Sequence, residues 1–187
     1  MEIKIAINGS EERFEAKQSD SLLDVLRRHG YTGAKRGCDT GDCGFCAVIV
    51  DGEARKSCVV PAKRAEGATV ETIESLGTQD DLHPVQEAFV DNTALQCGFC
   101  TPGMIMATTA YLRENPDPDL DDAEAREAID DVLCRCTGYK KIVESVQDAA
   151  ERMDGREQVA ADGGVASDVE ERADDGPADP GDGGESA

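Results

Sequence analysis

The chain has 187 residues, a length that allows one domain of ordinary size or two small ones. Only 4% of its residues are aromatic and 39% are hydrophobic, so the apolar surface available for burial is modest. Forty acidic against nineteen basic residues give a formal net charge of -21, which argues against nucleic acids and anionic membrane surfaces as partners. This acidity is typical of a halophilic protein in a salt-rich cytoplasm; an ordinary acidic protein with an acidic tail is the alternative.

The start of the chain alternates charged and apolar residues and does not look like a secretory signal. No later stretch approaches the roughly 20 apolar residues that a membrane span requires. We therefore expect a soluble, cytoplasmic protein with no membrane span. In a reducing cytoplasm its eight cysteines are expected to be metal ligands rather than a disulfide framework.

The first half of the chain has the pattern of short strands with one helix. Period-two alternation and the turn dipeptides Asn8-Gly9 and Asp51-Gly52 predict a starting hairpin and further strands around a cysteine loop. An apolar stripe at helical spacing predicts a helix over residues 21–29. The expected strands cover residues 3–7, 13–17, 47–50, 56–60 and 69–73.

After about residue 80 the apolar period changes from two to about 3.6, which predicts an all-helical half. The expected helices cover residues 84–93, 104–112, 121–133 and 140–153. Beyond Asp154 the chain is rich in Gly, Asp, Pro, Ala and Ser and has almost no large apolar residue. Residues 154–187 are therefore predicted to form a disordered, acidic, solvating tail.

Four cysteines of the first half lie on a glycine-rich loop and on the strand expected after it. They are Cys38, Cys43, Cys46 and Cys58, in the pattern C-x4-C-x2-C-x11-C. The first part of this pattern is the plant-type [2Fe-2S] ferredoxin spacing. Gly37, Gly41 and Gly44 supply the backbone freedom that wrapping a cluster requires, and they let N–H groups approach the sulfurs. A zinc site, which favours paired C-x2-C knuckles, is the alternative.

The second half holds the other four cysteines. Cys97 and Cys100 precede one predicted helix, and Cys134 and Cys136 follow another. Residues at i and i+2 of a helix project about 200° apart, so the helix must end near Cys134 if both thiols are to face one site. Thr137-Gly138 supplies such an end. On spacing alone a zinc site remains an alternative here, because C-x2-C and C-x-C both occur in zinc proteins.

Three segments, GCDTGDCGFCAV, QCGFCTPGM and LCRCTGY, occur in an order and spacing that resemble a known family. This family is the iron-sulfur subunit of xanthine dehydrogenase, aldehyde oxidoreductase and carbon monoxide dehydrogenase, the molybdenum hydroxylases. The resemblance covers residues 2–153 and implies an α+β chain. We expect a β-grasp [2Fe-2S] ferredoxin-like domain over residues 1–78, then an all-α four-helix [2Fe-2S] domain over residues 79–153, with the tail after it.

The resemblance implies an electron-transfer subunit without substrate chemistry of its own. Electrons would pass from molybdopterin on a large partner subunit to the second cysteine group, then to the first, and then to FAD on a medium subunit or to another acceptor. Two [2Fe-2S] clusters are the expected cofactors of this chain. Gln96 matches the family glutamine that hydrogen-bonds the pterin, and Cys136 matches the cluster ligand closest to it.

Other functions remain as alternatives. A free-standing ferredoxin-like carrier would also use [2Fe-2S] clusters, and a zinc-stabilised interaction protein would use none. Purine, aldehyde, carbon monoxide and N-heterocycle hydroxylases share the three segments, so the sequence does not select a substrate.

The chain departs from the family pattern before Cys134. Asp131-Val132 stands where Gly-Asn usually precedes Leu-Cys. The ligands are intact, but loss of the permissive glycine and of an amide side chain bears on how the preceding helix ends.

Overall fold

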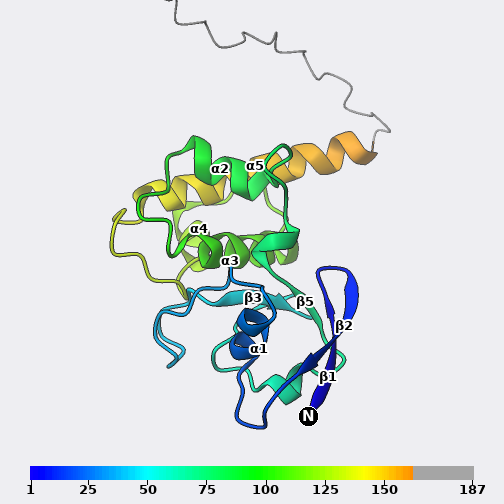
Figure 1. The fold of residues 1–187 in the computed structure, drawn as a ribbon. Coiled ribbons are helices and arrows are strands. Elements are labelled where there is room, and N and C mark those ends of the chain that lie inside the picture. Colours follow the sequence, from blue (N-terminus) through cyan, green and yellow to red (C-terminus); the bar gives the residue numbers. More distant parts are fainter. Residues whose placement is uncertain (162–187) are drawn as a thin grey trace, which may run out of the picture.

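The structure is a computed structural model that describes residues 1–161. A mixed sheet with one covering helix forms one part, and helices form the other, drawn below and above in Figure 1. The strands are β1 (Glu2–Ile7), β2 (Ser10–Glu15), β3 (Ala47–Val50), β4 (Glu53–Lys56) and β5 (Thr69–Glu71). The helices are α1 (Leu22–Arg28), η1 (Ala62–Ala65), η2 (Ile73–Ser75), α2 (Pro84–Asp91), α3 (Thr101–Glu114), α4 (Asp122–Glu127) and α5 (Lys140–Ala161).

The predicted hairpin at the start is confirmed as β1 and β2, although β2 covers residues 10–15 rather than 13–17, because the two-residue turn pairs Ile7 directly with Ser10. Asn8 and Gly9 have φ angles of 49° and 82°, the left-handed conformation that a two-residue hairpin turn needs at both positions. Ile3, Ile5 and Ile7 alternate along β1 and are at most 1% exposed. The sequence pattern of period two thus gives β1 one buried face.

The five strands lie in the order β2-β1-β5-β3-β4. β1 and β5 pair in parallel, and the other neighbouring strands pair antiparallel. Helix α1 covers one face of this sheet and buries Leu22, Leu23, Val25 and Leu26 with the isoleucines of β1. A capping box between Ser21 and Asp24 fixes where α1 begins.

The helical part has its own apolar core. Phe89 of α2, Met104 of α3, Ile129 after α4 and Val146 of α5 are all at most 2% exposed and belong to one cluster. Helices α2 and α5 run side by side above α3 (Figure 1). Arg152 of α5 joins them further, since it pairs with Asp91 of α2 as well as with Asp148. No helix within residues 1–161 is long and apolar enough to cross a membrane.

Strand β3 is buried on both faces. Val48 contributes to the core under α1, whereas Ala47 and Ile49 pack against Met106 and Ala110 of α3. This explains why residues 47–50 are continuously apolar rather than alternating. The sheet and the helical part therefore share a buried interface.

Two predicted segments differ from the structure in the region that carries cysteines. Helix α4 ends at Glu127, not at residue 133, because the chain turns and the N–H of Leu133 donates to the carbonyl of Cys43 instead of to a helical carbonyl. The strand expected at residues 56–60 is β4, over residues 53–56. The two-residue turn at Asp51-Gly52 pairs Val50 with Glu53, so the ladder is complete at Lys56, and Cys58 lies on the turn that follows.

The last described helix is longer than predicted. α5 runs to Ala161, beyond residue 153, where the acidic tail was expected to begin. Residues 156–161 include Arg, Glu, Gln and Ala, which favour helix. Residues 162–187, the remainder of the predicted tail, lie outside the described residues.

Candidate metal centres

The first cysteine group lies on the loop between α1 and β3 and on the turn after β4. It comprises Cys38, Cys43, Cys46 and Cys58, all of them free thiols. The thiol of Cys38 lies beside that of Cys43, and the thiol of Cys46 beside that of Cys58. The structure therefore brings the four predicted residues together as two neighbouring thiol pairs.

The thiols of this group differ in acidity. Contacts of the Cys38 thiol with the Thr40 side chain and with the backbone N–H groups of Cys43 and Thr40 lower the pKa of Cys38 to about 6. Burial raises the pKa of Cys43, and burial together with the hydrogen bond to Cys46 raises the pKa of Cys58 to about 12. A metal cluster takes thiolates as ligands, so binding at this group would release protons.

Gly37 keeps space open beside one of these sulfurs. A Cβ atom at residue 37 would lie 2.9 Å from Cys43 Sγ and 2.3 Å from the ring of Phe45. Backbone N–H groups point at the sulfurs as well, that of Phe45 at Cys43 and that of Gly41 at Cys58. Thiols, N–H donors and room around the sulfurs are the features that a [2Fe-2S] cluster requires.

The second cysteine group lies at the start of α3 and on the loop between α4 and α5. Cys100 is the N-cap residue of α3, and Cys97 precedes it. The thiol of Cys100 lies beside that of Cys134, and the thiol of Cys97 beside that of Cys136. Because α4 ends before Cys134, both cysteines of the loop reach the site. Cys97 and Cys136 are exposed and Cys100 is buried, so one pair faces solvent and the other the interior.

Burial and hydrogen bonds also shift the pKa values of thiols in the second cysteine group. Burial, reinforced by Cys134, raises the pKa of Cys100 to about 12. Burial acts on Cys134 too, but hydrogen bonds from the Thr137 hydroxyl and from the N–H groups of Thr137 and Cys136 outweigh it and lower its pKa. The hydrogen bond to Cys97 raises the pKa of Cys136.

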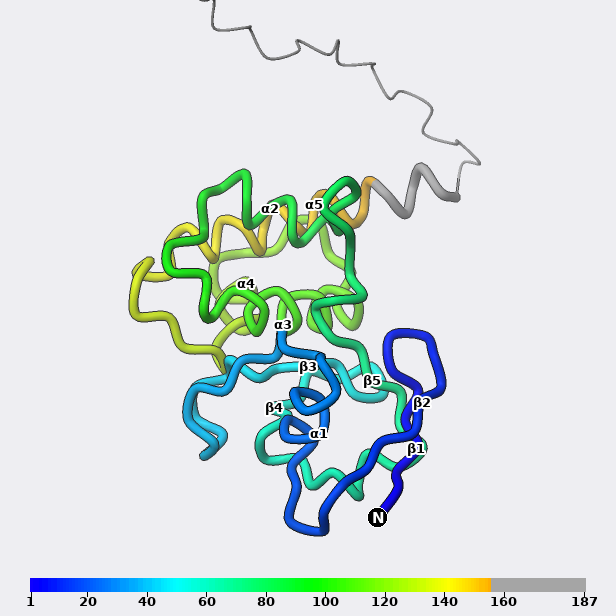
Figure 2. Tube along the Cα trace, in the orientation of Figure 1, coloured from blue at the N-terminus to red at the C-terminus, as the bar shows by residue number. Residues whose placement is uncertain are grey.

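The two cysteine groups are joined by direct contact between their loops (Figure 2). The N–H of Leu133, the residue before Cys134, donates to the carbonyl of Cys43 over 2.9 Å. The rings of Phe45 and Phe99 meet edge to face with their centroids 5.4 Å apart. A continuous path of backbone and hydrogen bond thus runs from one group to the other.

The outer side of the second group is apolar or basic in a chain that is otherwise acidic. Gln96 is exposed beside Cys97, and residues 92–103 contain no charged side chain. Leu95, Phe99 and Leu133 are 41%, 44% and 52% exposed. The exposed charged residues on the loop after Leu133 and at the start of α5 are Arg135, Lys140 and Lys141.

Three residues of these centres were not predicted in their observed roles. Thr137 and Tyr139 bond to Cys134, and their place inside the LCRCTGY segment was the available signal. Gly103 is the third, because a Cβ atom there would lie 2.7 Å from the carbonyl oxygen of Gly44. A glycine in the first turn of a helix is the sequence signal for such close packing.

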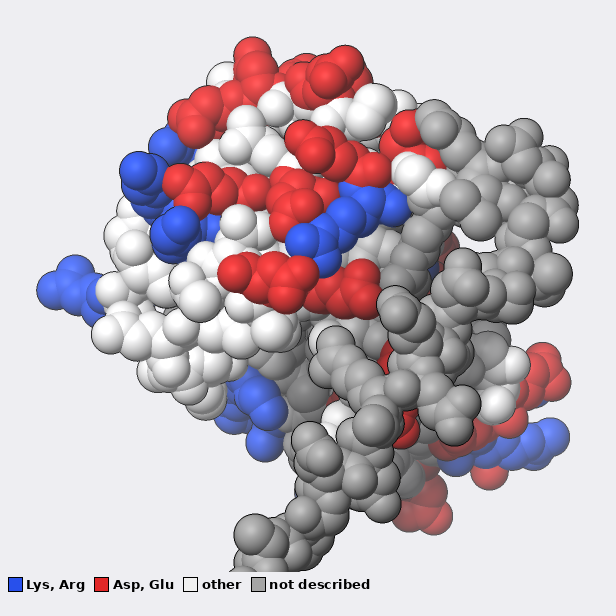
Figure 3. Space-filling view, turned by 90° about the horizontal axis from the view of Figure 1, so that it is seen from above, with Lys and Arg blue, Asp and Glu red and all other residues white. Residues whose placement is uncertain are grey.

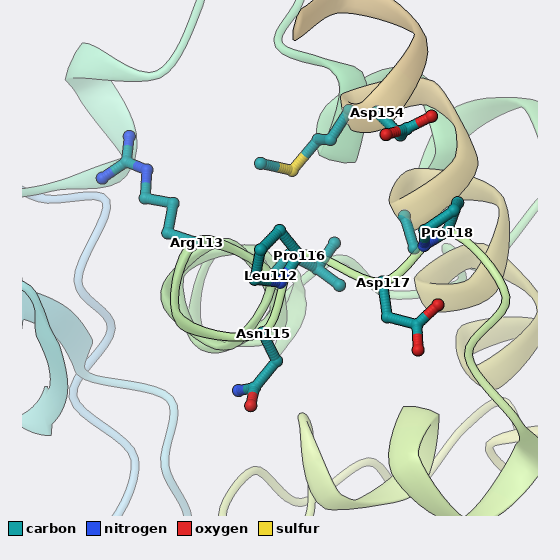
Figure 4. A pocket seen from close by; sticks show the side chains of 9 residues that line it. Leu112, Arg113, Asn115, Pro116, Asp117, Pro118 and Asp154 are labelled. Atoms are coloured by element: carbon teal, nitrogen blue, oxygen red, sulfur yellow. The ribbon is translucent and has the colours of Figure 1, made fainter.

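Within residues 1–161, the two cysteine groups included, no set of three or more His, Cys, Asp or Glu side chains converges on a position for a single metal ion. A pocket of about 160 Å³ lies between the end of α3, the loop after it and α5 (Figure 4). It is lined by Leu112, Arg113, Asn115, Pro116, Asp117, Pro118, Ala150, Met153 and Asp154, with no cysteine among them.

Two family models match the chain in sequence order. The model described as the 2Fe-2S iron-sulfur cluster binding domain matches residues 5–72. The model described as the [2Fe-2S] binding domain matches residues 72–147. Each match contains one of the two cysteine groups.

Known proteins resemble the chain over most of its length. The aldehyde oxidoreductase of Megalodesulfovibrio gigas is 43% identical over 154 residues, which are 81% of this chain but only 17% of that protein. The xanthine dehydrogenase iron-sulfur-binding subunit of Escherichia coli is 43% identical over 146 residues, which are 78% of this chain and 92% of that subunit. A solved chain of quinoline 2-oxidoreductase from Pseudomonas putida 86 superposes with a TM-score of 0.78 at 40% identity, covering 83% of this chain and 96% of the other.

These matches agree with the three cysteine segments in both order and extent. The chain spans a small part of the aldehyde oxidoreductase and nearly all of the xanthine dehydrogenase subunit. The chain belongs to the family of iron-sulfur subunits of the molybdenum hydroxylases of the xanthine dehydrogenase and aldehyde oxidoreductase type.

Proposed function

We propose that this chain is the electron-transfer subunit of a molybdopterin-dependent hydroxylase or dehydrogenase. The observation that carries the proposal is the hydrogen bond from Leu133 to Cys43, because it joins two separate cysteine groups into one path. Relatives that are themselves named iron-sulfur-binding subunits support it. No residue of this chain is assigned a part in substrate chemistry.

The eight thiols are proposed to hold two [2Fe-2S] clusters. One set of ligands is Cys38, Cys43, Cys46 and Cys58, and the other is Cys97, Cys100, Cys134 and Cys136. When bound, such a cluster takes up and releases one electron. The residues fit this cofactor, because the thiols meet in pairs, N–H groups point at the sulfurs and Gly37 leaves room beside Cys43.

Electrons are proposed to enter at the second group and to leave from the first. Cys97 and Cys136 are exposed, so a partner can approach them directly. Gln96 and Cys136 are proposed to face the pterin of that partner, since both are exposed and Gln96 is next to Cys97, whose thiol lies beside that of Cys136. At the inner side, Cys134 follows Leu133, whose N–H bonds to the first group.

A large molybdopterin-binding subunit is the proposed partner at the face that carries Leu95, Phe99 and Leu133. Exposed large apolar side chains mark interaction surfaces, and each of these three lies within three residues of an exposed cysteine in the sequence. An FAD-binding subunit is proposed as acceptor at the first group, where Val59, next to Cys58, is 53% exposed. The substrate of the complex, a purine, an aldehyde, carbon monoxide or an N-heterocycle, would be chosen by the large subunit.

We also propose a β-grasp ferredoxin-like domain over residues 1–78 and a four-helix domain over residues 79–153. The parallel pairing of β1 with β5 inside an otherwise antiparallel sheet supports the first, and helices α2 to α5 support the second. A salt-rich cytoplasm is the proposed location, because a net charge of -21 needs screening by ions.

Metal analysis and electron paramagnetic resonance test the proposal on anaerobically prepared protein. About four irons and four acid-labile sulfides per chain are expected from two [2Fe-2S] clusters. Cys43→Ser should remove the first cluster signal and leave the second. Two zinc ions in place of iron, or unchanged signals from both clusters in Cys43→Ser, would contradict the ligand assignment.

Isolation of the chain from its native host separates the subunit from a free-standing carrier. Molybdenum and a large partner should copurify with the subunit, and Cys134→Ser should stop substrate from reducing the first cluster. If neither molybdenum nor a partner accompanied the chain, the free-standing ferredoxin-like carrier would be the better assignment.

A further inference from the structure

Cys134 is held at two atoms by the residues that follow it. Its backbone N–H donates to the hydroxyl oxygen of Tyr139 over 2.7 Å, and this hydroxyl donates in turn to the carbonyl of Val132 over 3.3 Å. Its Sγ lies 3.2 Å from Oγ1 of Thr137. The Tyr139 N–H also donates to Thr137 Oγ1, over 3.2 Å. Thr137 and Tyr139 therefore form a closed clamp around Cys134.

The direction of the hydrogen bond between Thr137 and Cys134 follows from counting protons. A hydroxyl has one proton and two lone pairs, and here one lone pair accepts from the N–H of Tyr139. A sulfur that ligates metal is a thiolate and has no proton to give. The Thr137 hydroxyl must then be the donor and the sulfur the acceptor.

The backbone of the clamp occupies an uncommon conformation. Tyr139 has a φ of 68°, in the left-handed region that non-glycine residues rarely adopt, and it follows Gly138 with a φ of 66°. Such strain persists only where surrounding contacts impose it, and it gathers at functional sites. The bonds that Tyr139 makes to Cys134, Thr137 and Val132 are the contacts that impose it here.

The clamp acts on the side of the second group that faces the first. Val132 and Cys134 flank Leu133, whose N–H donates to Cys43. Cys134 pairs with the buried Cys100, whereas the exposed pair, Cys97 and Cys136, lies on the outer side. A donor at Cys134 is thus placed where electrons would leave the second group.

We propose that Thr137 is a positioning residue that raises the reduction potential of the second cluster, and that Tyr139 fixes its hydroxyl at Cys134. A hydrogen bond to a ligating sulfur stabilises the additional negative charge of the reduced state, so it favours reduction. This inference rests on the proposed function, because it requires a cluster at the second group.

Anaerobic redox titration of the full chain, followed by electron paramagnetic resonance, tests the proposal. Thr137→Val keeps the shape of the side chain and removes the hydroxyl, so the midpoint potential of the second cluster should become more negative. Thr137→Ser returns the hydroxyl and should restore the original midpoint. Thr40→Val is the matched control, because it removes a hydroxyl beside Cys38 of the first group and should leave the midpoint potential of the second cluster unchanged.

The outcomes separate this inference from the function on which it rests. The proposed role of Thr137 would be overturned if Thr137→Val showed both cluster signals but an unshifted midpoint potential of the second cluster. It would also be overturned if Thr40→Val shifted the midpoint potential of the second cluster by as much as Thr137→Val does. If Thr137→Val and Thr137→Ala both lost the second cluster while Thr137→Ser kept it, the hydroxyl would have a role in holding the site rather than in tuning it. If the unaltered chain bound no iron, the proposed function itself would fail.

Discussion

Gly44 shows how a single residue connects the two cysteine groups. Its φ of 71° lies in the left-handed region, and a Cβ atom there would lie 2.1 Å from the carbonyl oxygen of Asp131. The first property lets the loop wrap around the thiols, and the second lets it approach the segment before Cys134. Both depend on the absence of a side chain.

Gly44→Ala should therefore destabilise the chain by two effects, the left-handed backbone conformation and the overlap with Asp131. It should cost more stability than a glycine substitution that has only the first effect. Left-handed backbone costs an alanine about 1 kcal/mol, and overpacking against fixed backbone adds about 1–3 kcal/mol. Gly67→Ala is the matched control, because Gly67 has a φ of 76° and nothing within 4 Å of a Cβ atom. Urea unfolding measures both variants, and equal losses would contradict the role given to the contact with Asp131.

The hydrogen bond of Tyr31 should make the stability of the fold fall at high pH. Its hydroxyl donates to Glu12 over 2.9 Å, and burial, together with this bond, raises the pKa of Tyr31 above its usual value of about 10. Because the pKa of Tyr31 is higher in the folded chain than in the unfolded chain, the protonated Tyr31 hydroxyl contributes its full stabilisation below about pH 10. This stabilisation is lost as the pH rises through the raised pKa.

The stability lost in Tyr31→Phe should therefore be larger at pH 8 than at pH 11. At pH 8 the variant lacks the hydrogen bond and should be less stable by about 1 kcal/mol. As the pH rises above 10, the unaltered chain loses the contribution and the difference between the two proteins should narrow. Urea midpoints between pH 8 and pH 11 measure this difference, and two parallel curves would rule out the predicted linkage.

At the scale of elements, β3 and α3 hold the sheet and the helical part together. Met106 of α3 is 1% exposed and packs with Ala47 and Ile49 of β3. Arg113, further along α3, pairs with Glu71 of β5 over 3.0 Å, but both groups are partly exposed, so this pair adds little stability. Apolar contact therefore dominates the interface.

Met106→Ala should lower the free energy of unfolding by about 3 kcal/mol, because it removes a buried side chain and leaves a cavity. Val90→Ala is the control, since Val90 is 50% exposed and its truncation should change stability by no more than about 0.5 kcal/mol. Denaturant unfolding measures both variants. Similar losses would show that the interface at β3 contributes no more than an exposed position.

The elements that the sequence predicts well are those that local chemistry decides. Asn8-Gly9 determines a hairpin, and the apolar stripe determines α1, although Ser21, the first residue of the predicted helix, is its N-cap. The end of α4 was predicted six residues too late, at residue 133 instead of Glu127, because a contact with Cys43 on a distant loop decides it. A sequence pattern around residues 121–133 cannot predict a contact with a loop that is distant in the sequence.

In the candidate site, too, some features could be predicted from the sequence and others depend on the folded chain. The spacing of the cysteines predicts which thiols belong together, because one loop must present three of them. The roles of Thr137 and Tyr139 follow from hydrogen bonds that only the folded loop makes. Motif membership could mark these two residues, but only the structure gives each of them a partner atom.

At the scale of the whole molecule, charge is the dominant feature. The face above α2 and α5 carries Asp and Glu side chains across most of its width, with only a few Lys and Arg among them (Figure 3). Several acidic groups are compensated locally, as Asp148 and Asp91 are by Arg152. Residues 1–161 hold 31 acidic and 18 basic residues, so a net charge of -13 is left uncompensated in the described part of the chain. The folded state therefore gathers like charges that the unfolded chain holds farther apart.

Added salt should stabilise this fold, because ions screen repulsion between exposed charges over a distance that falls from about 10 Å at 0.1 M to about 3 Å at 1 M. The free energy of unfolding in urea should rise by at least about 1 kcal/mol between these concentrations of potassium chloride, since many exposed pairs each contribute a few tenths. Sodium chloride at equal ionic strength is the control and should act alike, because screening does not depend on the identity of the ion. A urea midpoint that stayed level or fell with salt would show that repulsion among the acidic side chains does not limit the stability of the chain.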